Sequence, residues 1–274
     1  MTIPYIIILM ATGMVAGFAS GLLGVGGAFI MTPVQYILFT NMGILPDVAI
    51  KLAFGTSLLV VLPTAISGTW RHHKKGVVWW KAAIIMGSCG SIAAFGGATL
   101  ATRLPGEALK IAFGAVVLAA GIRMLTAELP PVEQQPEDKP WLWVACAVPI
   151  GLVSGILGVG GAILIIPVTV IVLRFSMHYA IALSLAMMMF TSIGGVIGYI
   201  VNGLDVAGLP PYSVGYVNLP SWLLLTVASV GMAQVGAVIS HRLQGRYLKY
   251  IFTTVLFLLG LRMLGVFDLL GWTI

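Results

Sequence analysis

The sequence predicts an all-α, polytopic integral membrane protein built from two homologous repeats. Of its 274 residues, 59% are apolar and only 8% are charged, whereas about a quarter of the residues in soluble domains are charged. Three stretches contain no Asp, Glu, Lys, Arg or His, namely 1–46, 140–173 and 206–240. Each of them could hold one span of ~20 residues or more. This composition disfavours a soluble globule, a nucleic-acid binder, a secreted disulfide scaffold and a disordered regulator.

An internal duplication organises the chain. Residues 17–33, GFASGLLGVGGAFIMTP, match residues 151–167, GLVSGILGVGGAILIIP, with ten of 17 positions identical. Further matches follow, such as Ser57-Leu58 with Ser184-Leu185. We therefore divide the chain into repeat 1 (1–126), a linker rich in proline and acidic residues (127–140) and repeat 2 (141–274). Since the first apolar segment has a mate in repeat 2 and lacks a basic start, we expect it to stay in the mature protein rather than act as a signal peptide.

Each repeat contains five apolar segments. They are 3–22, 27–44, 48–69, 77–101 and 107–127 in repeat 1, and 141–157, 161–173, 178–202, 220–240 and 246–267 in repeat 2. The segment at 161–173 has 13 residues, and at ~1.5 Å per residue it falls short of a hydrocarbon core of ~30 Å. We therefore expect the first two segments of each repeat to form a broken or re-entrant hairpin with its glycine-rich tip inside the membrane.

The basic residues predict an inverted arrangement of the two repeats. The loop at 71–76, RHHKKG, is strongly basic, whereas its mate at 203–219 contains no Lys or Arg. The opposite bias distinguishes 241–249 from its counterpart at 102–110. Cytoplasmic loops carry the excess of Lys and Arg. Two corresponding loops of which only one is strongly basic are therefore expected on opposite sides of the membrane. This arrangement is common in secondary transporters, while a parallel pair of four-helix halves remains the alternative.

The glycine clusters are the candidate substrate-binding site. A glycine break followed directly by a helix permits close approach of a ligand and directs unpaired backbone N–H groups and the positive helix end toward one point. Neighbouring hydroxyls could add donors, although Ser and Thr often bond their own helix. The candidate substrate-binding residues are Ser20, Gly24, Val25, Gly26, Gly27, Thr56, Ser57, Ser154, Gly158, Val159, Gly160, Gly161, Ser184, Thr191 and Ser192.

Other residues of note have simpler interpretations. The pairs Gly17/Gly21 and Gly151/Gly155 have the four-residue spacing of close helix packing in membranes. Lysines at span ends, such as Lys51, are expected to extend toward the lipid headgroups. Cys89 and Cys146 are solitary and the histidines have no ligand spacing, so neither a metal nor a cofactor is expected.

The repeated motif resembles a known family. The paired GxxSGxLGVGGA…P signatures, the GTSL element at 55–58 and the closing RLPG…LK…GIRML and RLQG…LK…GLRML segments are similar to the TauE/SafE family of sulfite and organosulfonate exporters. The resemblance covers nearly the whole chain, and it implies a multi-pass transporter of the bacterial or archaeal cytoplasmic membrane. In repeat 2, Ala182 and Leu183 stand where repeat 1 has Gly55 and Thr56, so the polar GTS element is complete only once.

The expected function is therefore secondary transport, most simply export, of a small sulfur-containing or organic anion such as sulfite, thiosulfate or an organosulfonate. The anion is expected at a central site between the repeats, with the lipid bilayer as the other partner, no nucleic acid, and a homo-oligomer left open. No Asp or Glu lies well inside a span, so a buried carboxylate relay for protons is not predicted. An anion channel or facilitator is the alternative. An intramembrane enzyme is disfavoured because the hydroxyls lack a His or carboxylate at reachable depth.

Overall fold

The computed structural model describes residues 3–24, 26–126, 139–240, 242 and 245–266. Val25 and most of the expected linker lie outside these residues. The described chain forms helices α1 (Ile3–Leu23), α2 (Ala28–Asn41), α3 (Pro46–His73), α4 (Trp80–Arg103), α5 (Gly106–Thr126), α6 (Pro140–Leu157), α7 (Ala162–Ile171), α8 (Met177–Val201), α9 (Leu219–Ser240) and α10 (Gly245–Met263). The ten expected apolar segments match these helices within a few residues.

Local sequence signals set several helix starts. Pro46 and Pro140 stand at the beginning of α3 and α6, where the missing N–H of proline costs nothing. The side-chain oxygen of Asn218 accepts a hydrogen bond from the backbone N–H of Ser221 at 3.0 Å, which caps the first turn of α9. The α1–α2 and α6–α7 junctions lie instead at the two glycine clusters.

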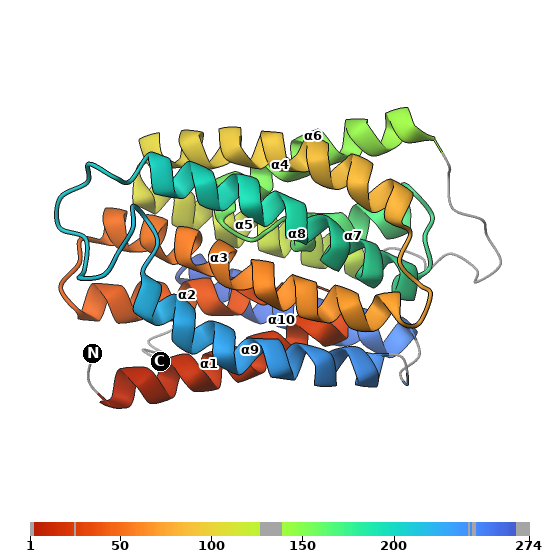
Figure 1. The fold of residues 1–274 in the computed structure, drawn as a ribbon, viewed down its shortest axis with the longest axis horizontal. Coiled ribbons are helices and arrows are strands. Elements are labelled where there is room, and N and C mark those ends of the chain that lie inside the picture. Colours follow the sequence, from red (N-terminus) through yellow and green to blue (C-terminus); the bar gives the residue numbers. More distant parts are fainter. Residues whose placement is uncertain (1–2, 25, 127–138, 241, 243–244, 267–274) are drawn as a thin grey trace.

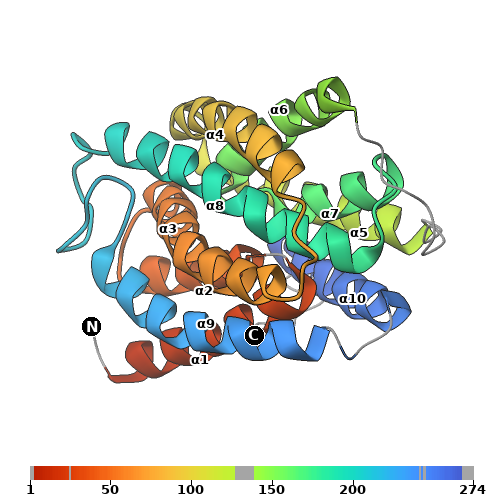
Figure 2. The ribbon, with the colours of Figure 1, turned by 45° about the vertical axis from the view of Figure 1, so that its right-hand side comes forward.

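Helices α3 and α8 lie side by side in the middle of the bundle, between α4 and α9 (Figures 1 and 2). Within the described residues, six helices are long and apolar enough to cross a membrane, namely α1, α3, α4, α6, α8 and α9. The most apolar windows of α3 and α8 are each 78% buried, whereas those of α4, α6 and α9 are 39% buried. The outer helices expose large apolar side chains, including Ile92 on α4 and Val227 on α9. This pattern fits a bundle whose outer surface faces lipid and whose core is the crossing of α3 and α8.

Helices that are far apart in the sequence pack against one another. Helix α1 packs along α9, and α6 packs along α4. Glycines permit both contacts, because a Cβ added to Gly21 would overlap the carbonyl oxygen of Ala233, and one added to Gly155 would overlap that of Ala94. Gly17 and Gly151 lie equally close to the facing backbone. The expected packing role of these four glycines is confirmed.

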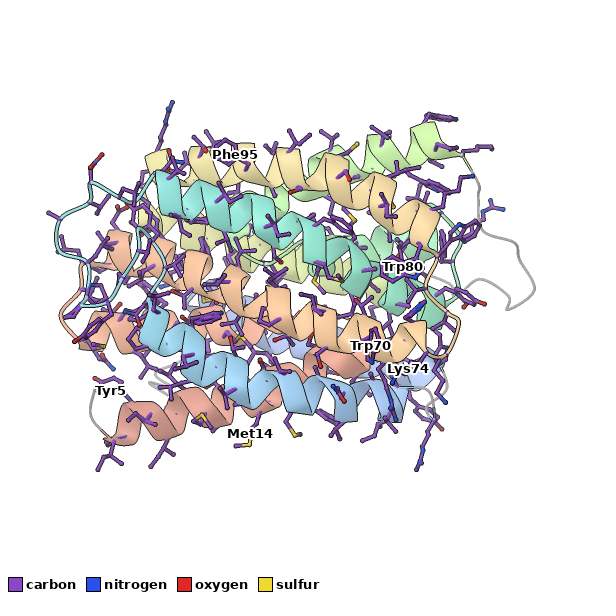
Figure 3. All side chains as sticks on the ribbon, in the orientation of Figure 1. Tyr5, Met14, Trp70, Lys74, Trp80 and Phe95 are labelled. Atoms are coloured by element: carbon purple, nitrogen blue, oxygen red, sulfur yellow. The ribbon has the colours of Figure 1, made fainter. Side chains whose placement is uncertain are left out.

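Corresponding loops lie at opposite ends of the bundle. The α3–α4 connection, which begins at Lys74, lies at one end (Figures 1 and 3). The α8–α9 loop lies at the other end, where α1 begins near Tyr5 (Figures 1 and 3). The C-terminal ends of α3 and α8 therefore point in opposite directions.

The position of the Lys51 side chain differs from the prediction. Its ammonium group binds the carboxylate of Asp47 at 2.8 Å, and the residue is only 5% exposed. The other carboxylate oxygen of Asp47 accepts a hydrogen bond from the N–H of Gly106 at the start of α5. The prediction that Lys51 extends to the headgroups is wrong, because a partner one turn earlier on α3 neutralises it in place.

Candidate functional site

The two glycine clusters lie where one helix ends and the next begins. We call Gly24, Gly26 and Gly27 the first break, which leaves out Val25 because it lies outside the described residues, and we call residues 158–161 the second break. Gly26 and Gly160 have φ values of +71° and +75°. This left-handed region is costly for residues with a Cβ and is populated readily by glycine. Gly27 and Gly161 also have positive φ values and directly precede α2 and α7. Each break therefore ends at the N-terminus of a helix.

Both breaks lie close to the same two side chains. A Cβ added to Gly26 would lie 2.8 Å from Sδ of Met188 and 3.2 Å from Cγ1 of Val61. A Cβ added to Gly160 would lie 3.1 Å from the same Val61 atom and 3.5 Å from the same sulfur. Val61 on α3 and Met188 on α8 are both fully buried. The N-termini of α2 and α7 thus converge where the two central helices cross.

Helix α8 is bonded to both breaks. The hydroxyl of Ser184 donates to the carbonyl oxygen of Gly24 at 2.6 Å. The hydroxyl of Thr191 donates to the carbonyl oxygen of Gly160 at 2.8 Å. These two residues lie one turn before and one turn after Met188, so α8 fixes the position of both breaks around that side chain.

Backbone N–H groups at the breaks can serve as anion donors. Among the described residues, none accepts a hydrogen bond from the N–H of Gly26, Gly27, Gly160 or Gly161. The N-terminus of a helix also carries about half a positive elementary charge. Two such ends therefore offer donors and a favourable potential without a charged side chain.

Two buried hydroxyls occupy equivalent positions beside the breaks. Ser20 and Ser154 are 0% and 2% exposed, and their Oγ atoms have no hydrogen-bond partner within the described ranges. Ser154, Val159 and Gly161 line a small pocket. The N–H of Val159 donates to the carbonyl of Ser154. A buried hydroxyl without a partner is destabilising unless water or a ligand satisfies it, so Ser154 provides a further donor at the second break.

Ser57 belongs to a polar cluster on the α2–α3 side. Its Oγ accepts hydrogen bonds from Oγ1 of Thr32 at 3.1 Å and from Nε2 of Gln35 at 2.8 Å. Gln35 is fully buried, and its Oε1 has no partner in the part of the chain that the structure describes. Sequence reasoning missed Gln35, although an amide within the apolar segment 27–44 was a usable signal.

Two predicted hydroxyls are engaged away from the breaks. Oγ1 of Thr56 accepts a hydrogen bond from the N–H of Asn218 at 2.9 Å, and the adjacent Gly55 faces the carbonyl of Tyr216. Gly55 and Thr56 of the GTS element therefore contact the long loop before α9. Ser192 donates to the carbonyl of Met188 on its own helix.

The remaining predicted residues gather around the breaks, apart from Val25, which lies outside the described residues. Gly24 and Gly158 pack against Ile181 of α8 and Phe54 of α3. The sequence reasoning also missed Val61 and Met188, whose apolar side chains give no signal of their own. Their signal lies in the repeat, since both follow the matched serines Ser57 and Ser184 by four residues.

Comparison with known proteins gives a consistent picture. The model of the family described as Sulfite exporter TauE/SafE matches residues 9–263. A probable membrane transporter protein of Methanocaldococcus jannaschii is 31% identical over 258 residues, which cover 94% of each chain. A probable membrane transporter protein of Haemophilus influenzae is 27% identical, covering 94% of this chain and 98% of its own length. No solved structure matches the chain. With six apolar helices, these relatives indicate a multi-pass membrane transporter.

Proposed function

The chain belongs to the sulfite exporter TauE/SafE family of membrane transporters, and from this membership we propose that it exports a small sulfur-containing or organic anion across the cytoplasmic membrane. Sulfite, thiosulfate and organosulfonates are the candidate substrates. The observation that carries the proposal is the convergence of both glycine breaks on Val61 and Met188. Paired helix N-termini near the middle of a bundle suit an anion that has lost part of its water.

The proposal includes two inverted repeats, 1–126 and 141–274, each with a re-entrant hairpin formed by its first two helices. The matched sequence motifs support it, as do the reciprocal contacts of α1 with α9 and of α6 with α4. The opposite positions of the α3–α4 connection and the α8–α9 loop also support it (Figure 1).

A carrier accounts for the packing better than an open channel does. Val61 and Met188 fill the space between the two breaks, and both are fully buried. A channel needs a continuous water-filled path, whereas a carrier closes around its substrate.

The topology can be tested by labelling single cysteines. In a background with Cys89 and Cys146 replaced by alanine, a cysteine at Lys74 is expected to react only from the cytoplasm. A cysteine at Pro211 is expected to react only from outside, because the two loops lie at opposite ends of the bundle. The measurement is labelling of intact cells with an impermeant maleimide before and after lysis. Labelling of both positions from one side would establish the parallel arrangement.

Anion binding can be tested directly on purified protein. A thermal-shift panel of sulfite, thiosulfate, sulfoacetate, taurine and simple carboxylates is expected to show stabilisation by at least one sulfur-containing anion. Calorimetric titration of that anion is then expected to give one site per chain, because one helix end alone carries too little charge to offset the loss of water. Two independent sites would contradict a shared site, and stabilisation by carboxylates alone would exclude the proposed sulfur-containing substrates.

A further inference from the structure

We propose that Met188 is the gate and size filter of the transport path, the movable side chain that separates the two glycine breaks. The inference rests on the proposed transport function and deepens it. The sulfur of Met188 would lie within 3.5 Å of a Cβ added to either Gly26 or Gly160, and Cγ1 of Val61 would lie within 3.2 Å of both. These two side chains are therefore the barrier that an anion meets between the N-termini of α2 and α7.

The backbone around this barrier is held in place. Ser184 and Thr191 bind the carbonyls of Gly24 and Gly160 from the turns on either side of Met188. Both hydroxyls are fully buried, and water does not compete for such bonds. Since the breaks are tied to α8, widening the gap between them by moving the backbone would break these bonds.

The side chains differ in how easily they can move. Val61 is β-branched, and a valine in a helix has one strongly preferred χ1 rotamer. Met188 is unbranched, with three rotatable bonds and a polarisable sulfur that tolerates varied packing. Rotation of Met188 therefore opens the space between the breaks at the lowest cost, while Val61 forms the fixed wall opposite it.

The neighbouring residue Met187 provides a matched control. It is also a fully buried methionine on α8. Its Cε would lie 3.0 Å from a Cβ added to Gly90 of α4, so it packs between helices on another face. A role confined to general packing predicts similar effects at both positions, whereas a gate predicts an effect specific to position 188.

The first experiment measures selectivity in proteoliposomes. Met188→Ala is expected to raise the transport of sulfoacetate relative to sulfite by about tenfold, since removing side-chain volume from a filter relaxes discrimination by size. Met187→Ala is expected to leave this ratio unchanged, even where it lowers stability. An unchanged ratio in Met188→Ala, or an equal change in both variants, would overturn the proposal.

The second experiment does not depend on which anion is transported. With Cys89 and Cys146 replaced by alanine, Met188→Cys is expected to react with 2-sulfonatoethyl methanethiosulfonate, a small anionic thiol reagent. Met187→Cys is expected to stay unreactive. Reaction at 188 alone supports the gate even if no anion of the panel is transported, in which case the proposed substrate class fails. Transport with no reaction at 188 would overturn the gate and leave the proposed function standing.

Discussion

Replacing Gly26 with valine is expected to abolish anion transport. Gly26 has a φ of +71°, and a β-branched residue in the left-handed region is strained by ~1–3 kcal/mol. The new Cβ would also lie 2.8 Å from the sulfur of Met188, in the approach to the backbone N–H groups. Gly160→Val is expected to have the same effect, because Gly160 has a φ of +75° and its new Cβ would lie 3.1 Å from Cγ1 of Val61. The measurement is uptake into proteoliposomes at matched protein content, where both variants are expected to fall to the background of empty vesicles.

Gly231→Val is the matched control for this loss. Gly231 lies within α9, is exposed, and has no atom within 4 Å of an added Cβ. Transport by this variant is expected to equal that of the unmodified protein. Normal transport by a correctly folded Gly26→Val variant would show that an anion does not need the backbone of the break.

Replacing Gly21 or Gly155 with leucine is expected to prevent stable folding. An added Cβ at Gly21 would overlap the backbone of Ala233, and one at Gly155 would overlap that of Ala94. Helix backbones cannot give way as a flexible side chain can, so α1 would separate from α9, or α6 from α4. The expected loss is about 3 kcal/mol or more, at the upper end for overpacked sites. The measurement is the melting temperature and the monodisperse fraction in detergent.

Gly96→Leu tests whether any bulky residue has this effect. Gly96 lies on α4, is exposed, and has open space around its Cβ position. This variant is expected to melt within a few degrees of the unmodified protein. A stable Gly21→Leu protein would mean that α1 and α9 can pack at a greater separation.

The helices were predictable because long apolar runs and glycine clusters mark their bounds directly. The pairing of helices was not predictable from these signals. Aligning the repeats shows that α1 corresponds to α6, but it does not show that α1 packs on α9 of the other repeat. Lys51 was misjudged for a related reason, since the sequence shows Asp47 one turn away but not the burial that makes their pairing matter.

The candidate site was predictable where backbone geometry defines it. Adjacent glycines before a helix indicated the breaks, and positive φ values are found at Gly26, Gly27, Gly160 and Gly161. The side chains between the breaks were missed because Val61 and Met188 have no polar atoms that suggest a site. Hydroxyl partners such as those of Thr56 depend on a loop 162 residues away, which no local pattern reveals.

The pairing of early helices with late ones has a consequence for biosynthesis. Helices α1 and α4 are made early, yet their glycine-lined faces pack on α9 and α6, which are made later. Until residues 140–240 emerge from the ribosome, these two helix faces therefore have no partner to pack against. A chain stopped after residue 126 would lack both partner helices.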